Sequence, residues 1–436
     1  MSTTFADHVR QLQERYETAI GLQADIDGIL LHSGLEKYYF ADDQCAPFRL
    51  FGHFAQWLPV DRPDQLILIR PGRKPRYFQV IPPDFWYDQT VDNAGWWADC
   101  FEITVLTDEQ LVAEHLPAAD TLAFIGEDEA LAAELGIRPE SINNSSLLNY
   151  LDYFRAYKTR HEIEQIRSAN QLALEGHAAA RDCFLNGGNE FEIHLAYLSA
   201  CGITEAECPY PNIVALDEKA SILHYQNRNR NGIGKKSQVL LIDAGSRINN
   251  YCSDITRTTA KDSCPAIFRD IVRGVDELEQ QLVGKVKVGA SYIELHREAL
   301  SALTELAVRL DLIRCGVEQA MSLGLPQLLM PHGVGHLLGV QVHDVGGHLA
   351  SPDGGTAPPP PEYPFLRNTR IMTDSMVFTV EPGFYFIPML LDPERTTPRG
   401  KELNWSLIDQ LLPLGGVRIE DNVLVTPAGP VNLTRQ

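Results

Sequence analysis

The sequence predicts a protein of the mixed α/β (α+β) class with two domains. The chain has 436 residues, well above the roughly 150 residues of a typical single domain, and 44% of them are hydrophobic. Short apolar runs of strand length alternate with segments whose apolar residues recur at helical spacing. A clear helix-start signal near residue 158 separates a first α/β region from a longer second one.

The first region predicts one helix and several short strands. Residues 1–22 have the polar and apolar alternation of an amphipathic surface helix. An aromatic stretch at residues 84–101 is interpreted as a core or interface patch. The predicted strands are residues 25–32, 65–70, 76–81 and 121–126.

The domain boundary is predicted at residue 157. Thr159 and Glu162 have the spacing of a capping box, which satisfies backbone donors at the start of a helix. Ile163, Ile166 and Ala169 then follow at helical spacing. The predicted domains are therefore residues 1–157 and residues 158–436.

The second region mixes longer helices with strands. Residues 351–364 are expected to form a loop, because four consecutive prolines cannot continue a helix or a central strand. The predicted helices are residues 265–283 and 291–310, and the clearest strands are residues 238–242, 376–380 and 417–425.

Composition excludes several kinds of partner. The formal charge is −21, and such a surface repels the phosphates of nucleic acids. No apolar run is long enough for a membrane-spanning helix, and residues 1–22 lack the apolar core of a signal peptide. The eight cysteines form no CxxC pair and suit a reducing compartment, so we expect a cytoplasmic protein.

Five acidic or histidine side chains stand at strand ends or beside glycines. Each alone has an ordinary explanation as a turn, capping or satisfied polar residue. The two glutamates flank apolar strands, where a carboxylate is costly unless it is paired or bound to a metal. The candidate ligands are Asp243, Asp254, His336, Glu381 and Glu420.

This donor set suits hard or borderline divalent cations. It offers carboxylate oxygens and one imidazole nitrogen but no thiolate, which favours Mn²⁺, Co²⁺ or Fe²⁺ over a cysteine-based zinc site. Four carboxylates exceed what a single divalent ion needs. The set therefore predicts two ions bridged by carboxylates and a water that becomes hydroxide near neutral pH.

Five motifs between residues 240 and 422 carry these residues: LLIDAG, SDITRT, HGVGHLLGVQVHDVGG, TVEPG and GGVRIEDN. Their order resembles the pita-bread metallopeptidases, which include methionine aminopeptidase, aminopeptidase P and prolidase. The resemblance implies a pita-bread catalytic domain at residues 158–436, after an N-terminal α/β domain that serves dimerisation and limits substrate size.

Three stretches are most similar to the bacterial Xaa-Pro dipeptidases, or prolidases: residues 39–59, 84–101 and 404–422. This implies hydrolysis of dipeptides with a C-terminal proline by a metal-bridging hydroxide. Organophosphorus acid anhydrolases share these motifs, so hydrolysis of organophosphate triesters is a possible side activity. The alternatives are an aminopeptidase P that accepts longer peptides, and a non-catalytic peptide-binding protein.

The resemblance also implies a role for each candidate ligand. Asp243 would bind one ion, Asp254 and Glu420 would bridge both, and His336 and Glu381 would complete the other. Glu381 would also act as the general base. The expected cofactor is a pair of divalent ions, Mn²⁺ in the first place, with Co²⁺ and Zn²⁺ as alternatives.

Three further histidines, His224, His332 and His343, match active-site positions that do not bind metal. They would contact the carbonyl oxygen, the substrate carboxylate or the reaction intermediate. Arg418 lies two residues before Glu420, so strand alternation places both on one face. It could clamp the substrate carboxylate, or it could form a salt bridge with the acidic ligands.

The remaining expectations concern the pocket wall and the partner subunit. By resemblance, Asp42 or Asp43, with Asp43 as the first candidate, would reach the site of a neighbouring subunit in a homodimer. Four residues match pocket-lining positions but suit the core equally well: Tyr210, Tyr292, Val342 and Leu366.

Overall fold

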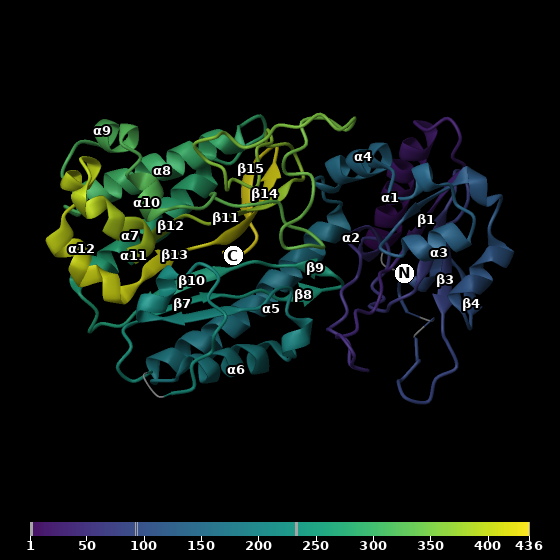
Figure 1. Ribbon diagram of the computed structural model, residues 1–436, viewed down its shortest axis with the longest axis horizontal. Coiled ribbons are helices and arrows are strands. Elements are labelled where there is room, and N and C mark those ends of the chain that lie inside the picture. The colour runs from purple at the N-terminus through teal and green to yellow at the C-terminus, as the bar shows by residue number, and fades with distance from the viewer. Residues whose placement is uncertain (1–2, 92, 94, 232–233, 436) are drawn as a thin grey trace. The chain divides into compact units, whose positions relative to one another are not determined.

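The computed structural model describes residues 3–91, 93, 95–231 and 234–435, which form two compact units (Figure 1). The first unit consists of Met1–Arg155 with the short segments Thr159–Glu162 and Leu349–Gly355. The second consists of Ala156–Lys158, Ile163–His348 and Thr356–Gln436. None of the helices in the described residues is both long and apolar enough to span a bilayer.

The first unit contains a five-stranded mixed sheet in the order β4-β3-β2-β1-β5. Strand β1 pairs antiparallel with β2 and parallel with β5, while β3 pairs antiparallel with β2 and parallel with β4. The strands are β1 (Gly28–His32), β2 (Leu66–Ile69), β3 (Arg76–Val80), β4 (Glu102–Leu106) and β5 (Leu122–Ile125). The helices are α1 (Thr3–Gly21), α2 (Gly52–Ala55), α3 (Glu129–Glu134) and α4 (Ser145–Arg155).

Side-chain alternation along β1 builds a core on each face of this sheet. Ile29 and Leu31 pack with Tyr16 of α1 and Leu147 of α4, whereas Leu30 packs on the opposite face. Both faces of the sheet are thus covered, which explains why β1 is an uninterrupted apolar run.

The second unit places short sheets between two sets of helices. Its helices are α5 (Arg160–Leu185), α6 (Glu190–Cys201), α7 (Ala266–Lys285), α8 (Tyr292–Arg309), α9 (Val317–Ser322), α10 (Pro326–Leu329), α11 (Pro388–Leu391) and α12 (Trp405–Leu411). Its strands are β6 (Ile213–Leu216), β7 (Val239–Asp243), β8 (Arg247–Ile248), β9 (Tyr251–Cys252), β10 (Thr256–Ala260), β11 (Val377–Val380), β12 (Gly383–Tyr385), β13 (Gly416–Arg418), β14 (Asp421–Thr426) and β15 (Gly429–Asn432).

Figure 1 shows α5 and α6 on one side of strands β7 and β10, with α7 and α8 on the other side. The first helix pair packs against β6 and β7 through a core that contains Phe184 and Tyr197. The second pair buries the largest core of the chain together with β11 and β13. The strands order β10-β7-β6 in one sheet and β11-β14-β15 in another, and β12 pairs with β13.

Most predicted elements are present, and the capping box is confirmed. The backbone N–H of Thr159 donates to the Glu162 carboxylate at 2.7 Å, and the N–H of Glu162 donates to the Thr159 hydroxyl at 3.3 Å. Residues 351–364 form no helix or strand, as their prolines predicted. Strand β4 was not predicted; only Leu106, at its end, is buried.

The single strand predicted at residues 417–425 is wrong. The chain forms β13 and β14 there, separated by Ile419 and Glu420, because it changes partner from β12 to β11. At the break, Glu420 makes an isolated bridge with Thr256. This change of partner brings a carboxylate from one sheet to the end of another.

Candidate metal centre

The five candidate ligands lie around one pocket in the second unit, although they come from five separate positions along the chain, with His336 in the segment between α10 and β11. Asp243 ends β7, Asp254 precedes β10, Glu381 follows β11, and Glu420 lies between β13 and β14. The pocket is lined by Leu223, His224, Asp243, Asp254, Pro331, His332, Gly333, Gly335, His336, His343, Phe365, Arg367, Glu381, Arg418 and Glu420.

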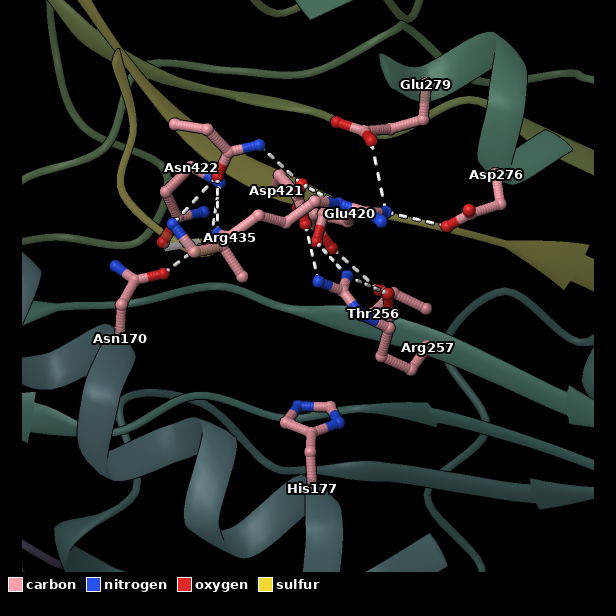
Figure 2. Close-up of polar contacts among 12 residues, drawn as sticks. Asn170, His177, Thr256, Arg257, Asp276, Glu279, Glu420, Asp421, Asn422 and Arg435 are labelled. Atoms are coloured by element: carbon pink, nitrogen blue, oxygen red, sulfur yellow. Dashed lines mark hydrogen bonds and ion pairs between the residues drawn. The ribbon is translucent and has the colours of Figure 1, made fainter.

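Strand register explains how distant carboxylates meet. Asp243 lies directly opposite Thr256 in the β7–β10 pair, and Thr256 also bridges to Glu420. The Thr256 hydroxyl donates to Oε2 of Glu420 at 2.7 Å and fixes that carboxylate (Figure 2). The backbone ladder therefore places these acidic side chains before any ion binds.

Asp254, His336 and Glu420 are buried, and one donor atom of each lies within 4.8 Å of the others. Nε2 of His336 is 3.3 Å from Oδ2 of Asp254 and 3.7 Å from Oε1 of Glu381. Nδ1 of His336 donates to the carbonyl oxygen of Leu337 at 3.0 Å, which leaves Nε2, the nitrogen that faces the carboxylates, as the one that can bind a cation. A histidine that binds a metal ordinarily has this arrangement.

An unsatisfied carboxylate oxygen is a second indication that these residues suit a divalent cation. Oε1 of Glu420 is buried and has no hydrogen-bond partner among the described residues. A buried carboxylate oxygen without a donor is costly, and a cation would satisfy it. The donor set of oxygens with one nitrogen suits Mn²⁺ or a similar divalent ion.

Burial and mutual repulsion raise the pKa values of three of these carboxyl groups. Burial raises the pKa of Glu381 to about 7 and the pKa of Asp243 to about 6. Burial, followed by the charges of Asp254 and Glu381, raises the pKa of Glu420 well above its ordinary value. Without a cation the cluster must hold protons, and a bound cation would replace them.

Two residues hold the Asp243 side chain in place. The Tyr210 hydroxyl lies 2.8 Å from Oδ1 of Asp243 and 2.5 Å from Oδ1 of Asp254. The Arg418 guanidinium donates to Oδ2 of Asp243 at 2.6 Å, and its side chain is only 5% exposed. The structure thus gives Arg418 a salt bridge with an acidic residue of the cluster, which is one of the two possibilities that the sequence left open.

A chain of hydrogen bonds connects Arg418 to His332. Arg418 donates to the Tyr385 hydroxyl at 2.9 Å, and that hydroxyl lies 2.9 Å from Nε2 of His332. Nδ1 of His332 donates to the carbonyl oxygen of Gly333 at 2.7 Å. Burial, with the charge of Arg418, lowers the pKa of His332 to about 3. His332 is therefore neutral, and both of its nitrogens are already occupied.

His224 and His343 differ from His332, because neither has a hydrogen-bond partner among the described residues that line the pocket. Burial lowers the pKa of His224, and burial with the charge of His336 lowers the pKa of His343 to about 3. Each neutral ring has one N–H to donate to a bound molecule.

The pocket wall also contains Phe365 and Arg367, which no sequence motif predicted. Arg367 is exposed and has no ion-pair partner among the described residues. Only its position after the proline-rich loop could have drawn attention to it. An exposed guanidinium beside an acidic centre can bind a carboxylate.

The other predicted wall residues lie elsewhere. Tyr292 and Leu366 are in the main core, with the Tyr292 hydroxyl donating to the carbonyl oxygen of Thr379 at 2.7 Å. Val342 packs at the edge of a smaller cluster. None of the three is among the described residues that line the pocket. Asp43 belongs to the first unit, where it is exposed and accepts from the Gln44 amide at 3.3 Å.

A second group in the first unit, His32, Asp64 and Glu109, also has donor atoms within 4.8 Å of one another. Nδ1 of His32 accepts the backbone N–H of Gly34 at 3.1 Å. The ring proton therefore sits on Nε2, the nitrogen that faces both carboxylates at 3.9 Å. A protonated nitrogen has no lone pair for a metal, so this group is the weaker candidate.

The fold and this centre define a metal-dependent hydrolase of the metallopeptidase class. Residues 164–427 match metallopeptidase family M24, and residues 3–153 match the Xaa-Pro dipeptidase N-terminal domain. The chain belongs to metallopeptidase family M24, within the Xaa-Pro dipeptidase branch.

Curated relatives span the whole chain. An Xaa-Pro dipeptidase from Aeromonas hydrophila is 40% identical and covers 100% of this chain and 98% of its own length. An Xaa-Pro dipeptidase from Pseudoalteromonas atlantica is 38% identical, with the same coverage. The family resemblance deduced from the motifs is therefore confirmed.

Solved structures confirm the predicted fold class. Aminopeptidase P from E. coli with the inhibitor Pro-Leu matches with a TM-score of 0.75 and 21% identity, covering 98% of this chain and 95% of that one. Proline aminopeptidase P II from Yersinia pestis matches with a TM-score of 0.72 and 21% identity, covering 98% and 96%. At this identity the likeness concerns the fold alone, the pita-bread architecture with an N-terminal α/β unit.

Proposed function

We propose that the chain hydrolyses Xaa-Pro dipeptides at the bond before a C-terminal proline. The observation that carries this proposal is a pocket that combines a buried carboxylate–histidine centre with an exposed arginine, Arg367, for which the described part of the chain offers no ion-pair partner. The relatives at about 40% identity that share its full length are named Xaa-Pro dipeptidases. The aminopeptidase P structures are only 21% identical, which makes that activity the second candidate.

The proposed cofactor is a pair of divalent ions, Mn²⁺ in the first place. Asp243 would hold one ion, His336 and Glu381 the other, and Asp254 and Glu420 would be shared. When bound, the pair supplies positive charge for the developing oxyanion and lowers the pKa of a shared water to near neutrality.

Glu381 is the proposed general base. Its carboxylate faces His336 at 3.7 Å and lines the pocket. Burial raises its pKa to about 7, so it can accept a proton and pass it to the leaving proline nitrogen.

His224 and His343 are the proposed donors to the substrate carbonyl oxygen. Both line the pocket and are neutral, each with one free N–H. His332 would act indirectly: with Tyr385 it holds the Arg418 side chain that fixes Asp243.

Chain length would be limited by recognition of both ends of the dipeptide and by the N-terminal domain, residues 1–157. We also propose a cytoplasmic homodimer. All eight cysteines are free thiols, as a reducing compartment favours. Exposed aromatic side chains of the first unit, Phe40, Phe85 and Trp86, provide apolar surface of the kind that interfaces use.

The function is tested with Ala-Pro, Met-Pro and Ala-Pro-Ala on protein loaded with Mn²⁺. We expect cleavage of both dipeptides and about 10- to 100-fold slower cleavage of the tripeptide, because the tripeptide has an amide where the dipeptide presents its proline carboxylate, and it loses a charge-assisted bond worth about 1.5–3 kcal/mol. Proline release measured by chromatography gives the rates. Equal cleavage of the tripeptide would transfer the assignment to aminopeptidase P.

Replacing Arg367 with glutamine is expected to raise KM for Ala-Pro by about 10- to 100-fold with little change in kcat. A charge-assisted bond to a carboxylate contributes about 1.5–3 kcal/mol, and it is made equally in the ground and transition states. Ala-Pro amide, which lacks the carboxylate, is the control substrate, and its KM should hardly change between wild type and variant. A similar KM increase for both substrates would contradict this role.

A further inference from the structure

The two carboxylates assigned to bridging, Asp254 and Glu420, are held by neighbouring residues of one strand. The side chain of Asn422 in β14 makes two hydrogen bonds with the backbone of Asp254. Its Oδ1 accepts the Asp254 N–H at 3.1 Å, and its Nδ2 donates to the Asp254 carbonyl at 2.5 Å. Asn422 is fully buried, so this double contact has no competition from water.

Arg257 and Asp421 fix Glu420 in a similar way. Nη1 of Arg257 donates to the carbonyl oxygen of Glu420 at 2.8 Å, and Nη2 donates to Oδ1 of Asp421 at 2.6 Å. Asp421 is 0% exposed. One guanidinium thus ties together two successive residues at the break between β13 and β14 (Figure 2).

Residues Asn432–Arg435 make hydrogen bonds to both Asp421 and Asn422. Asp421 also accepts from Nε of Arg435 at 2.5 Å and from Nδ2 of Asn432 at 2.6 Å. The backbone N–H of Asn422 donates to the hydroxyl of Thr434 at 2.9 Å. The segment Asn432–Arg435 therefore bonds to both Asp421 and Asn422, the two residues next to the carboxylates assigned to bridging.

Arg435 anchors that segment to the long helix α7. Its Nη2 lies 2.7 Å from Oδ1 of Asp276 and 3.2 Å from Oε2 of Glu279, as Figure 2 shows. Burial, with the charge of Asp421, raises the pKa of Glu279 to about 9, so Glu279 is neutral at neutral pH. The guanidinium groups of Arg257 and Arg435 then balance the carboxylates of Asp421 and Asp276.

We propose that the segment Asn432–Arg435 is a positioning element of the metal centre, with Arg435 as its anchor, and that it sets the spacing of Asp254 and Glu420 through Asn422 and Asp421. The inference rests on the proposed function for its ligand assignment. Groups that orient metal ligands from outside typically change metal affinity by about 10- to 100-fold when they are removed.

The test measures Mn²⁺ binding by calorimetry to full-length wild type, Arg435→Gln, Arg435→Lys and Arg395→Gln. Arg395 is the matched control: its side chain is 36% exposed against 31% for Arg435, and it also pairs with two carboxylates, those of Asp392 and Asp409. Binding is measured at a temperature where circular dichroism shows every variant folded, so that a general loss of stability does not enter the affinity.

We expect Arg435→Gln to weaken Mn²⁺ binding by about tenfold or more, Arg395→Gln to leave it unchanged, and Arg435→Lys to restore part of it. With dipeptide as substrate, excess Mn²⁺ should recover most of the kcat lost in Arg435→Gln. Wild-type affinity in Arg435→Gln, or equal weakening in both glutamine variants, would overturn the inference.

The inference and the proposed function can fail separately. Wild type that binds two ions but cleaves no Xaa-Pro dipeptide would remove the proposed function, and the affinity comparison would still decide the role of Arg435. Wild type that cleaves the dipeptide while Arg435→Gln binds Mn²⁺ normally would remove the positioning role alone. Wild type that binds no divalent ion would overturn both.

Discussion

Replacing Glu381 with glutamine is expected to lower kcat for Ala-Pro by about 10³- to 10⁴-fold. The amide keeps the shape of the side chain but cannot accept the proton of the attacking water, and general acid–base catalysis contributes about 10²- to 10⁴-fold. The change also removes the charge of a proposed metal ligand, so the effect should fall at the upper end of that range. Initial rates at saturating Mn²⁺ and substrate measure it.

Glu277→Gln is the control for this prediction, because Glu277 is an exposed glutamate on α7 outside the pocket. It should retain wild-type kcat. The metal content of both variants is measured beside the rates, to separate lost proton transfer from lost ions. A Glu381→Gln enzyme that keeps its ions and works within tenfold of wild type would contradict the assignment of Glu381 as the base.

Removal of divalent ions by chelation is expected to lower dipeptide cleavage by at least about 10³-fold, and Mn²⁺ should restore it. Metal ions contribute several kcal/mol to such a transition state, and each 1.36 kcal/mol is tenfold in rate. Activity before chelation, after it and after re-addition is compared with metal content by mass spectrometry. Full activity in metal-free protein would contradict the proposed centre.

The affinity of the metal-free protein for Mn²⁺ is expected to fall as the pH is lowered. Burial raises the pKa of Glu381 to about 7 and that of Glu420 well above its ordinary value, so both groups keep their protons to a higher pH in the metal-free protein than ordinary glutamates do. Metal ions bind the deprotonated groups, and binding therefore releases protons. Apparent Mn²⁺ affinity should fall as the pH drops below about 7. Calorimetry in buffers of different ionisation enthalpy counts the protons, and no release at pH 6 would contradict these pKa shifts.

The sequence predicted those helices and loops that are determined by interactions between residues close together along the chain. The capping box of Thr159 and Glu162 involves residues three apart, and both of its hydrogen bonds are present. The prolines of residues 351–364 exclude helix and strand by their own geometry. Helices α7 and α8 follow from apolar spacing within a single segment.

The candidate ligands could be named from the sequence because each stands in a short motif with unusual local chemistry. Their meeting in one pocket could not be deduced from spacing, since Asp243 and Glu420 are far apart along the chain. That meeting depends on the register of β7 against β10 and on the bridge between Thr256 and Glu420.

The two arginines of the pocket, Arg418 and Arg367, show most clearly what could not be predicted from the sequence. Arg418 stands beside a ligand motif, and the sequence allowed it either to bind substrate or to pair with the acidic ligands. In the fold it is buried against Asp243, whereas Arg367, which no motif marks, is the exposed arginine in the pocket wall. Burial of a side chain depends on what packs over it, and the sequence around it does not contain that information.

The sequence by itself determined the family, the α/β class and the donor chemistry of the centre, because these depend on residue types and on contacts within a few positions. The tertiary structure alone decided where β13 gives way to β14 and which arginine faces the pocket. It also decided that Arg435 bonds to Asp421 beside Glu420, and that Thr434 bonds to Asn422, which holds Asp254. These features arise from hydrogen bonds between residues far apart in the chain, and only folding brings such partners within reach.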